Sequence, residues 1–222
     1  MPRKLKSSTR KSRRNRNRVL AIGLLIVVVV AIVVFFVFGQ SSPSSNNIGN
    51  NSTGLTDNNN GTSSNGPTKV LLQTTMGNII IQLRDDMPIT TANFKNLVQH
   101  GTYDGTIFHR VIDDFMIQGG DPTGTGFGDP SIPNIEDEFS SNSTNNRNSR
   151  GTIAMANTGQ PNSGSSQFFI NVVYNSHLDN KHPVFGDVIE GMDVVDVISK
   201  VATDASGKPL QNVTIIKAEI QS

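Results

Sequence analysis

The sequence predicts a mainly β domain that carries two α-helices and is joined by a flexible linker to a transmembrane helix. Short apolar runs with strand-like alternation recur from residue 68 onward, separated by Gly, Pro, Asn and Ser clusters. This pattern is typical of a barrel or a sandwich. Two further segments have apolar residues at helical spacing. A separate apolar run near the N-terminus is long enough to cross a bilayer.

The first 38 residues combine a basic segment with an apolar one. Residues 1–18 contain nine Lys or Arg and no acidic residue, and residues 19–38 are free of charge. Twenty residues at ~1.5 Å each span a hydrocarbon core of about 30 Å, whereas a signal peptide has an apolar core of only ~7–15 residues. We therefore predict a single-pass anchor in the cell membrane, with residues 1–18 cytoplasmic and the later domain extracytoplasmic. Secretion after cleavage is the alternative.

The charge distribution argues against nucleic acid as a partner. The chain has 19 basic and 18 acidic residues, so the part after residue 18 has ten bases against 18 acids, a net charge of about −8. Phosphate binding draws on clustered Lys and Arg. A nucleic-acid-binding arm at residues 1–18 is less favoured, because a basic flank beside a membrane span is already explained. The absence of cysteine excludes disulfides and cysteine-ligated metals.

Residues 39–67 are dominated by Asn, Ser, Gly and Thr. Such a segment cannot bury enough apolar surface to offset its ordering entropy, so we predict a flexible tether. Triplets of the form Asn-x-Ser/Thr would permit glycosylation, although chance occurrence in an Asn-rich sequence is an equal alternative. They begin at Asn50, Asn51, Asn60, Asn142 and Asn212.

The folded domain, residues 68–222, is predicted to open with a β-hairpin. Ile79, Ile81 and Leu83 alternate with their neighbours, and Gly77 supplies the turn. A helix of about three turns should begin at Pro88, with Asp85 and Asp86 suited to its N-terminus. Its apolar stripe comprises Thr90, Phe94, Leu97, Val98 and Gly101.

Further strands and a second helix follow. Short strand-like runs occur at residues 107–112, 115–119, 152–156, 168–172 and 184–188. The second helix is predicted at 192–200 and the last strand at 213–220. The residues alone thus predict a mostly antiparallel barrel with two helices.

Three motifs in this domain resemble the signature of cyclophilins. They are FHRVI with FMIQGGD (108–112 and 115–121), MAN with SQFFI (155–157 and 166–170), and LDNKHPVFG (178–186). The resemblance covers residues 68–222. It implies a closed eight-stranded antiparallel β-barrel capped by two α-helices, and peptidyl-prolyl cis-trans isomerase activity.

The chemistry of the prolyl bond indicates what such a site requires. Rotation about the X–Pro bond breaks amide conjugation, against a barrier of ~18–20 kcal/mol. In the twisted transition state the nitrogen gains a lone pair. A cationic donor near that nitrogen, beside an apolar surface that holds the ring, therefore favours the transition state. The reaction needs no nucleophile, metal or cofactor.

The resemblance assigns Arg110 as the catalytic residue, whose rigid fork of donors suits the role better than a lysine. It also implies a substrate-binding set consisting of Phe115, Met116, Gln118, Ala156, Asn157, Gln167, Phe169, His177, Leu178 and His182. Among these, the resemblance assigns the apolar walls of the proline pocket to Phe115, Met116, Phe169 and Leu178. It places His182 at the rim of that pocket and implies that Gln118 orients the arginine. The Ala156 and Asn157 backbone would pair with the peptide. Taken singly, Phe115, Met116 and Phe169 would be interpreted as core and Arg110 as a solvated surface residue.

Other sites are disfavoured. The four histidines (His100, His109, His177 and His182) lack a helical i,i+4 pair and cysteine partners, so no zinc site is expected. Residues 124–128 only faintly resemble a nucleotide-binding loop and are interpreted as a surface turn bordering the substrate groove. No Gly-x-Ser-x-Gly elbow supports a hydrolase.

Two departures from the cyclophilin pattern bear on specificity. His177 stands where many members carry a Trp associated with cyclosporin binding, which puts inhibitor sensitivity in doubt. The loop at residues 158–166 is about one residue longer than the common form, which could change the pocket beside the proline site.

The favoured hypothesis is a monomeric isomerase that accelerates folding of secreted or membrane proteins by acting on their proline-containing segments, with the membrane contacted through residues 19–38. A proline-binding chaperone without catalysis and a structural surface-interaction module are the alternatives.

Overall fold

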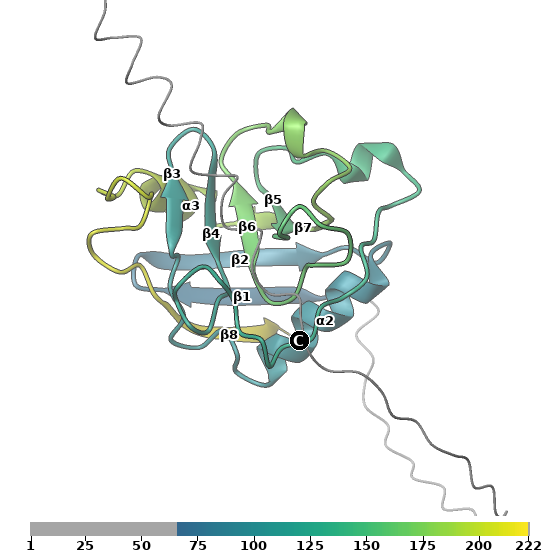
Figure 1. Cartoon of the computed structure of the whole chain (residues 1–222), viewed down its shortest axis with the longest axis horizontal. Helices are drawn as coiled ribbons and strands as arrows, with labels where there is room; N and C mark the ends of the chain where they lie inside the picture. The colour runs from purple at the N-terminus through teal and green to yellow at the C-terminus, as the bar shows by residue number, and fades with distance from the viewer. Residues whose placement is uncertain (1–65, 222) are drawn as a thin grey trace, which may run out of the picture. The chain divides into compact units, whose positions relative to one another are not determined.

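An eight-stranded antiparallel sheet is the framework of residues 66–221, the part of the chain that this computed structural model describes. Its strand order is β3-β4-β6-β5-β7-β2-β1-β8. The strands are β1 (Lys69–Thr74), β2 (Gly77–Leu83), β3 (Arg110–Ile112), β4 (Met116–Gly119), β5 (Thr152–Met155), β6 (Phe168–Asn171), β7 (Val184–Glu190) and β8 (Ile215–Gln221). Figure 1 shows β1, β2 and β8 running across the direction of β3, β4 and β6.

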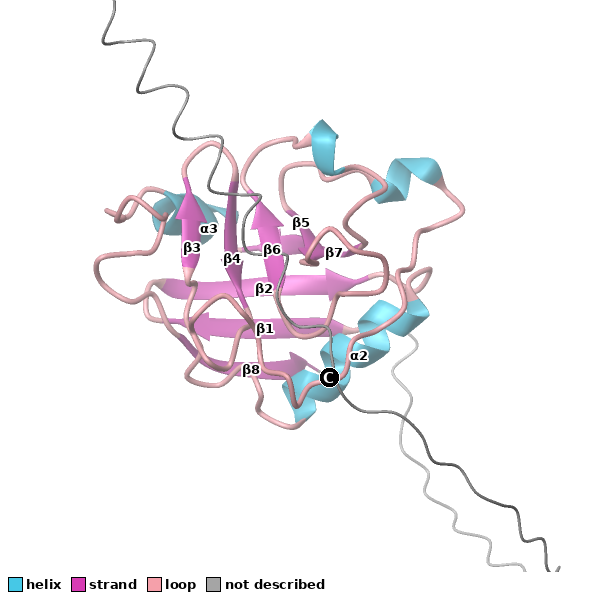
Figure 2. Ribbon diagram, in the orientation of Figure 1, coloured by secondary structure: helices cyan, strands magenta, loops and turns pink. Residues whose placement is uncertain are grey.

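Two α-helices and two short 3₁₀ helices complete the domain (Figure 2). They are α2 (Pro88–Gln99), α3 (Met192–Ser199), η1 (Ser143–Asn146) and η2 (Ser176–Leu178). The predicted hairpin is confirmed, with Thr74 paired to Gly77 across its turn. Both predicted helices are confirmed as well. Neither α2 nor α3, the α-helices of the described range, has the length and apolar character of a membrane span.

The N-terminus of α2 is stabilised by a distant residue. We expected the adjacent aspartates to serve this end, but Glu138 does so, because its carboxylate accepts hydrogen bonds from the backbone N–H groups of Ile89 (3.1 Å) and Thr90 (2.9 Å). Asp86 instead accepts hydrogen bonds from Ser140 and Asn145. The carboxylate at the helix end is thus supplied by the loop that follows β4.

Aromatic side chains fill the main core. The Phe94 ring of α2 lies 5.1 Å from Tyr103, 5.1 Å from Phe185 and 5.6 Å from Phe168, measured between ring centroids. All four side chains have an exposed fraction of 0%. Phe94 therefore joins α2 to strands β6 and β7, in tilted and edge-on contacts that aromatic rings favour.

The prediction of a closed barrel is wrong, because the sheet is open between its edge strands β3 and β8. Loops occupy both edges. The Val111 N–H of β3 donates to the carbonyl of Gly207 (2.7 Å), and Ile215 of β8 exchanges hydrogen bonds with residues 105 and 106. One isolated bridge, Ile107 with Thr214, lies between these regions. Since β3 has only three residues and loops take its outer hydrogen bonds, it does not pair with β8.

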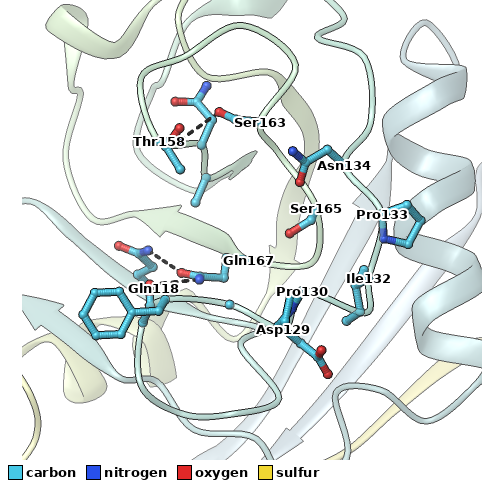
Figure 3. A pocket seen from close by; sticks show the side chains of 15 residues that line it. Gln118, Asp129, Pro130, Ile132, Pro133, Asn134, Thr158, Ser163, Ser165 and Gln167 are labelled. Atoms are coloured by element: carbon cyan, nitrogen blue, oxygen red, sulfur yellow. Dashed lines mark hydrogen bonds between the residues drawn. The ribbon is translucent and has the colours of Figure 1, made fainter. Parts of the chain in front are cut away.

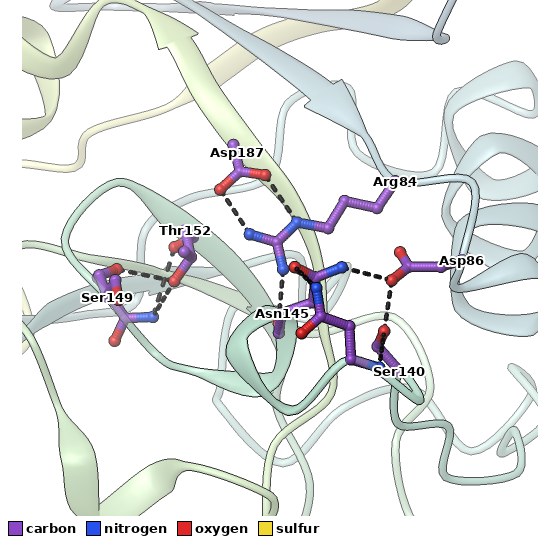
Figure 4. A network of polar contacts seen from close by, with 9 residues as sticks. Arg84, Asp86, Ser140, Asn145, Ser149, Thr152 and Asp187 are labelled. Atoms are coloured by element: carbon purple, nitrogen blue, oxygen red, sulfur yellow. Dashed lines mark hydrogen bonds and ion pairs between the residues drawn. The ribbon is translucent and has the colours of Figure 1, made fainter.

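A polar network fastens the 140–146 segment to the sheet (Figure 4). Arg84, directly after β2, makes a two-pronged ion pair with Asp187 of β7, with both N–O distances at 2.7 Å. The third guanidinium nitrogen donates to the Asn145 carbonyl. A planar guanidinium suits such multiple contacts. One side chain thereby joins two strands to a loop.

The basic segment (1–18), the anchor (19–38) and nearly all of the tether (39–67) lie outside the described residues, so these remain predictions. The first strand of the described residues, β1, begins at Lys69.

Phe94→Ala is expected to lower the free energy of unfolding by about 3–5 kcal/mol, because it removes a fully buried ring. Denaturant unfolding of the full chain in detergent measures the change. Ile89→Ala on the same helix, at a position 41% exposed, is the control and should cost about 1 kcal/mol or less. Equal losses in the two variants would contradict the assignment of Phe94 to the core.

Candidate active site

Strand register places five residues in one row across the sheet. Arg110 of β3 pairs with Gln118 of β4, Gln118 with Phe169 of β6, Phe169 with Ala154 of β5, and Ala154 with Val184 of β7. Residues paired in this way lie on the same face of a sheet. The neighbouring row, from Val111 to Ile153, faces the main core instead.

An apolar cluster adjoins this row, at the place of the predicted proline pocket. Its buried members form a cluster separate from the main core: Met116, Ala154, Phe169 and Val184. Partly buried side chains pack against them: Ile112, Phe115, Ala156 and Leu178. The four predicted wall residues are therefore brought together from β4, β6, the β3–β4 turn and η2. Taken singly, Phe115, Met116 and Phe169 are interpreted as core, and two of them are indeed nearly inaccessible, with Met116 1% and Phe169 4% exposed.

Two histidines border the pocket. His177 stacks on Phe115, with ring centroids 5.6 Å apart and planes inclined by 22°. His182 meets Phe169 edge-on at 5.4 Å. The His182 Nδ1 lies 3.2 Å from the Met155 carbonyl, which can only accept, so Nδ1 carries a proton. Burial lowers the pKa of His182 and favours the neutral ring.

Arg110 is half-buried at one end of the row. Its Nη1 donates to Gln118 Oε1 (3.3 Å), and its guanidinium carbon lies 5.8 Å from the centre of the Phe115 ring. Burial lowers the pKa of Arg110, but arginine stays charged in proteins. The site thus holds a partly desolvated cation against an apolar wall.

A chain of side-chain amides continues from Arg110 to a loop. Gln118 Nε2 donates to Gln167 Oε1 (2.9 Å), and Gln167 Nε2 donates to the Gly126 carbonyl (3.1 Å). Each amide has one defined orientation in this chain, and the Gln118 oxygen faces Arg110. Gln118 thus holds one end of the Arg110 guanidinium, and the orienting role that the resemblance implies for it stays a prediction.

Asp121 organises the loop that receives this chain, a role that our sequence reasoning missed. The carboxylate is fully buried and accepts hydrogen bonds from Thr123, Gly126 and Gly128. Burial alone would raise the pKa of Asp121, but these hydrogen bonds outweigh it and lower the pKa. The signal was present in the sequence as an Asp followed by a Thr- and Gly-rich turn.

A pocket of about 710 Å³ adjoins the site at Gln118 and Gln167 (Figure 3). It lies between the Gln118–Gln167 pair, the turn at 126–128 and the segment at 158–165. The loop that the sequence marked as longer thus lines a pocket beside the predicted proline site. Phe127, 89% exposed, stands on the turn at its rim.

Ala156 and Asn157 line this pocket, and Ala156 also packs against the apolar cluster. The Ala156 N–H donates to the Gln167 carbonyl (3.0 Å), so this donor is occupied within the domain. Asn157 Nδ2 donates to the Lys181 carbonyl (2.8 Å). Pairing of this backbone with a peptide stays a prediction. Within residues 66–221 no cluster of three His, Asp or Glu side chains is placed to hold a metal ion.

Comparison with known proteins decides the family. Residues 69–220 match the family described as cyclophilin type peptidyl-prolyl cis-trans isomerase/CLD. This chain belongs to that family. Its activity is accordingly peptidyl-prolyl cis-trans isomerisation.

Named relatives agree over the whole domain. The peptidyl-prolyl cis-trans isomerase ppi1 of Schizosaccharomyces pombe is 46% identical over 150 residues, covering 67% of this chain and 96% of the relative. Peptidyl-prolyl cis-trans isomerase-like 1 of Homo sapiens is 43% identical over 153 residues, covering 68% and 92%.

Solved cyclophilins share the fold. A cyclophilin type peptidyl-prolyl cis-trans isomerase of Cryptosporidium parvum superposes with a TM-score of 0.66 at 32% identity, covering 71% of this chain and 99% of that one. A second structure of that protein, in the presence of the dipeptide ala-pro, gives 0.65 at 33% identity, covering 69% and 99%.

Lowering the pH from about 7 to 5 is expected to lower the free energy of unfolding, because burial lowers the pKa values of His109 and His182. Histidine in the unfolded chain takes up protons near its ordinary pKa of 6.5, whereas the folded rings resist protonation until the pH is lower. The unfolded state then binds more protons and is favoured. Denaturant unfolding across this range measures the effect.

The variant His182→Gln should reduce the pH dependence of the free energy of unfolding. The control is His100→Gln, at an exposed position, which should leave that dependence in place. A flat parental profile, or one that His182→Gln does not alter, would contradict the burial argument.

Proposed function

We propose that the isomerase acts through Arg110, with the prolyl ring held by Phe115, Met116, Phe169 and Leu178. The observation that supports this most is the cross-strand row, which puts the guanidinium and the apolar floor on one face of the sheet. Gln118 holds the arginine by the hydrogen bond at 3.3 Å.

The arrangement suits a non-covalent mechanism. As the X–Pro bond twists, the nitrogen lone pair becomes available as an acceptor, and Arg110 donates to it. Because the guanidinium is already oriented by Gln118 and partly desolvated, little reorganisation is needed when the charge changes. The ring stays in the apolar pocket while the carbonyl side of the bond rotates, so binding energy is used to favour the twisted state.

The substrates we propose are proline-containing segments of secreted or membrane proteins, reached just outside the cell membrane. The support is the charge-free run at 19–38, the basic flank before it and the Asn/Ser/Gly-rich segment after it. The presence of ala-pro with the C. parvum relative supports an Ala-Pro peptide as the assay substrate.

Arg110→Ala is expected to lower kcat/KM for an Ala-Pro peptide by roughly 10²–10³, about 2.7–4 kcal/mol, because it removes a preorganised donor. Exchange between cis and trans peptide, followed by NMR with the full chain in detergent, measures the rate. Arg110→Lys keeps the charge without the planar fork and should recover only part of the activity.

Arg150→Ala is the matched control, since this arginine pairs with Asp196 and is not among the proposed pocket residues. It should retain parental kcat/KM. Parental activity in Arg110→Ala would overturn the catalytic role, and peptide binding without exchange in the parent would favour the chaperone alternative.

Topology makes a separate prediction, based on the basic residues before the apolar run. Protease added to intact cells should release the isomerase domain by cutting within residues 39–67, and an antibody to the domain would detect the fragment. A domain that is cut only after lysis would contradict the proposed orientation. A domain found in the medium without protease would favour secretion.

A further inference from the structure

Three buried asparagines bond to the segments that carry the apolar cluster: Asn148, Asn171 and Asn175, here called the asparagine cluster. Their exposed fractions are 0%, 0% and 4%. Asn171 ends β6 and Asn175 directly precedes η2. A buried amide is costly unless its donors and acceptor are paired. The hydrogen-bond partners of these three side chains therefore show which segments of the chain the cluster connects.

Asn171 joins the other two. Its Oδ1 accepts a hydrogen bond from Asn175 Nδ2 (2.7 Å). Its Nδ2 donates to Asn148 Oδ1 (3.2 Å) and to Thr152 Oγ1 (2.9 Å). Thr152 belongs to β5 and is labelled in Figure 4. The Asn175 N–H also donates to the Asn148 carbonyl (2.9 Å). Three chain segments are thus linked through one side chain of β6.

The cluster also bonds to two walls of the pocket. Asn175 Nδ2 donates to the Phe115 carbonyl (3.0 Å), and Asn148 Nδ2 donates to the Leu178 carbonyl (3.1 Å). Phe115 belongs to the β3–β4 turn and Leu178 to η2. These segments are far apart in the sequence, and His177 of η2 stacks on the Phe115 ring.

We propose that the asparagine cluster positions the pocket walls, fixing the spacing between Phe115 and Leu178. A prolyl ring is rigid, so the walls must contact it without a gap, and a gap of about 0.5–1 Å already forfeits a quarter to a half of the dispersion energy of a contact. The inference deepens the proposed function and rests on it. Because the ring is held in both ground and transition states, the cluster should act on KM more than on kcat.

Asn175→Ala tests the proposal. It removes the hydrogen bonds to the Phe115 carbonyl and to Asn171 Oδ1. The Phe115 carbonyl keeps its hydrogen bond from the Val172 N–H (3.0 Å). KM for an Ala-Pro peptide is expected to rise about tenfold, since sub-ångström misplacement in a site is costly, with kcat within about twofold of the parent. The NMR signals of the His177 ring should also shift as its stacking on Phe115 changes.

Asn146→Ala is the matched control. Asn146 has the same exposed fraction, 4%, and its amide bonds both the N–H and the carbonyl of Ser140, each at 2.8 Å. It should lower thermal stability to a similar degree but leave KM and the His177 signals unchanged. If Asn175→Ala does not fold, Asn175→Ser, whose shorter hydroxyl can donate only one bond, takes its place.

The proposal is supported if KM rises in the Asn175 variant alone. It is overturned if KM stays parental, if both variants lose activity in step with thermal stability, or if kcat falls without a change in KM. Failure here is distinguishable from failure of the proposed function, because Arg110→Ala would still lose activity when only the wall-spacing role is wrong.

Discussion

The in-register pairing of β3, β4, β6 and β5 is the constraint on which the proposed site depends. Side chains alternate between the two faces of a strand, so a slip of one residue would exchange the row that begins at Arg110 for the row that begins at Val111. The large main core prevents such a slip, because Ile117, Ile153 and Ile170 are all fully buried on the opposite face. The energy that stabilises the sheet therefore also fixes the geometry of the proposed site.

Polar side chains then attach the loops to this frame. Asp121 holds the turn at 126–128, Arg84 holds the 140–146 segment, and the asparagine cluster holds η2. In each case a buried or half-buried group bonds to backbone atoms of a loop. Buried polar groups need such partners, so the loops around the site have defined positions although few of their residues enter the core.

Local patterns in the sequence predicted much of the fold and, through the family motifs, the residues that meet in the pocket. Alternation predicted the first hairpin, and helical spacing predicted α2 and α3. The prediction of a closed barrel was wrong, because closure depends on which groups form hydrogen bonds with Val111 and Ile215 at the two edges of the sheet. The roles of Glu138 and the asparagine cluster were missed, since most of their partners lie in distant segments. The role of Asp121 was missed although the Thr- and Gly-rich turn that it holds follows it directly in the sequence.

The most direct test of this account is to map where an Ala-Pro peptide binds to the full chain, using intermolecular NOEs in detergent. The account predicts contacts from the prolyl ring to the Met116 methyl group and the rings of Phe115 and Phe169, with a shift of the Arg110 side-chain N–H signals. Prolyl contacts confined to the neighbouring pocket, at Thr158, Ser163 and Phe127, would contradict it.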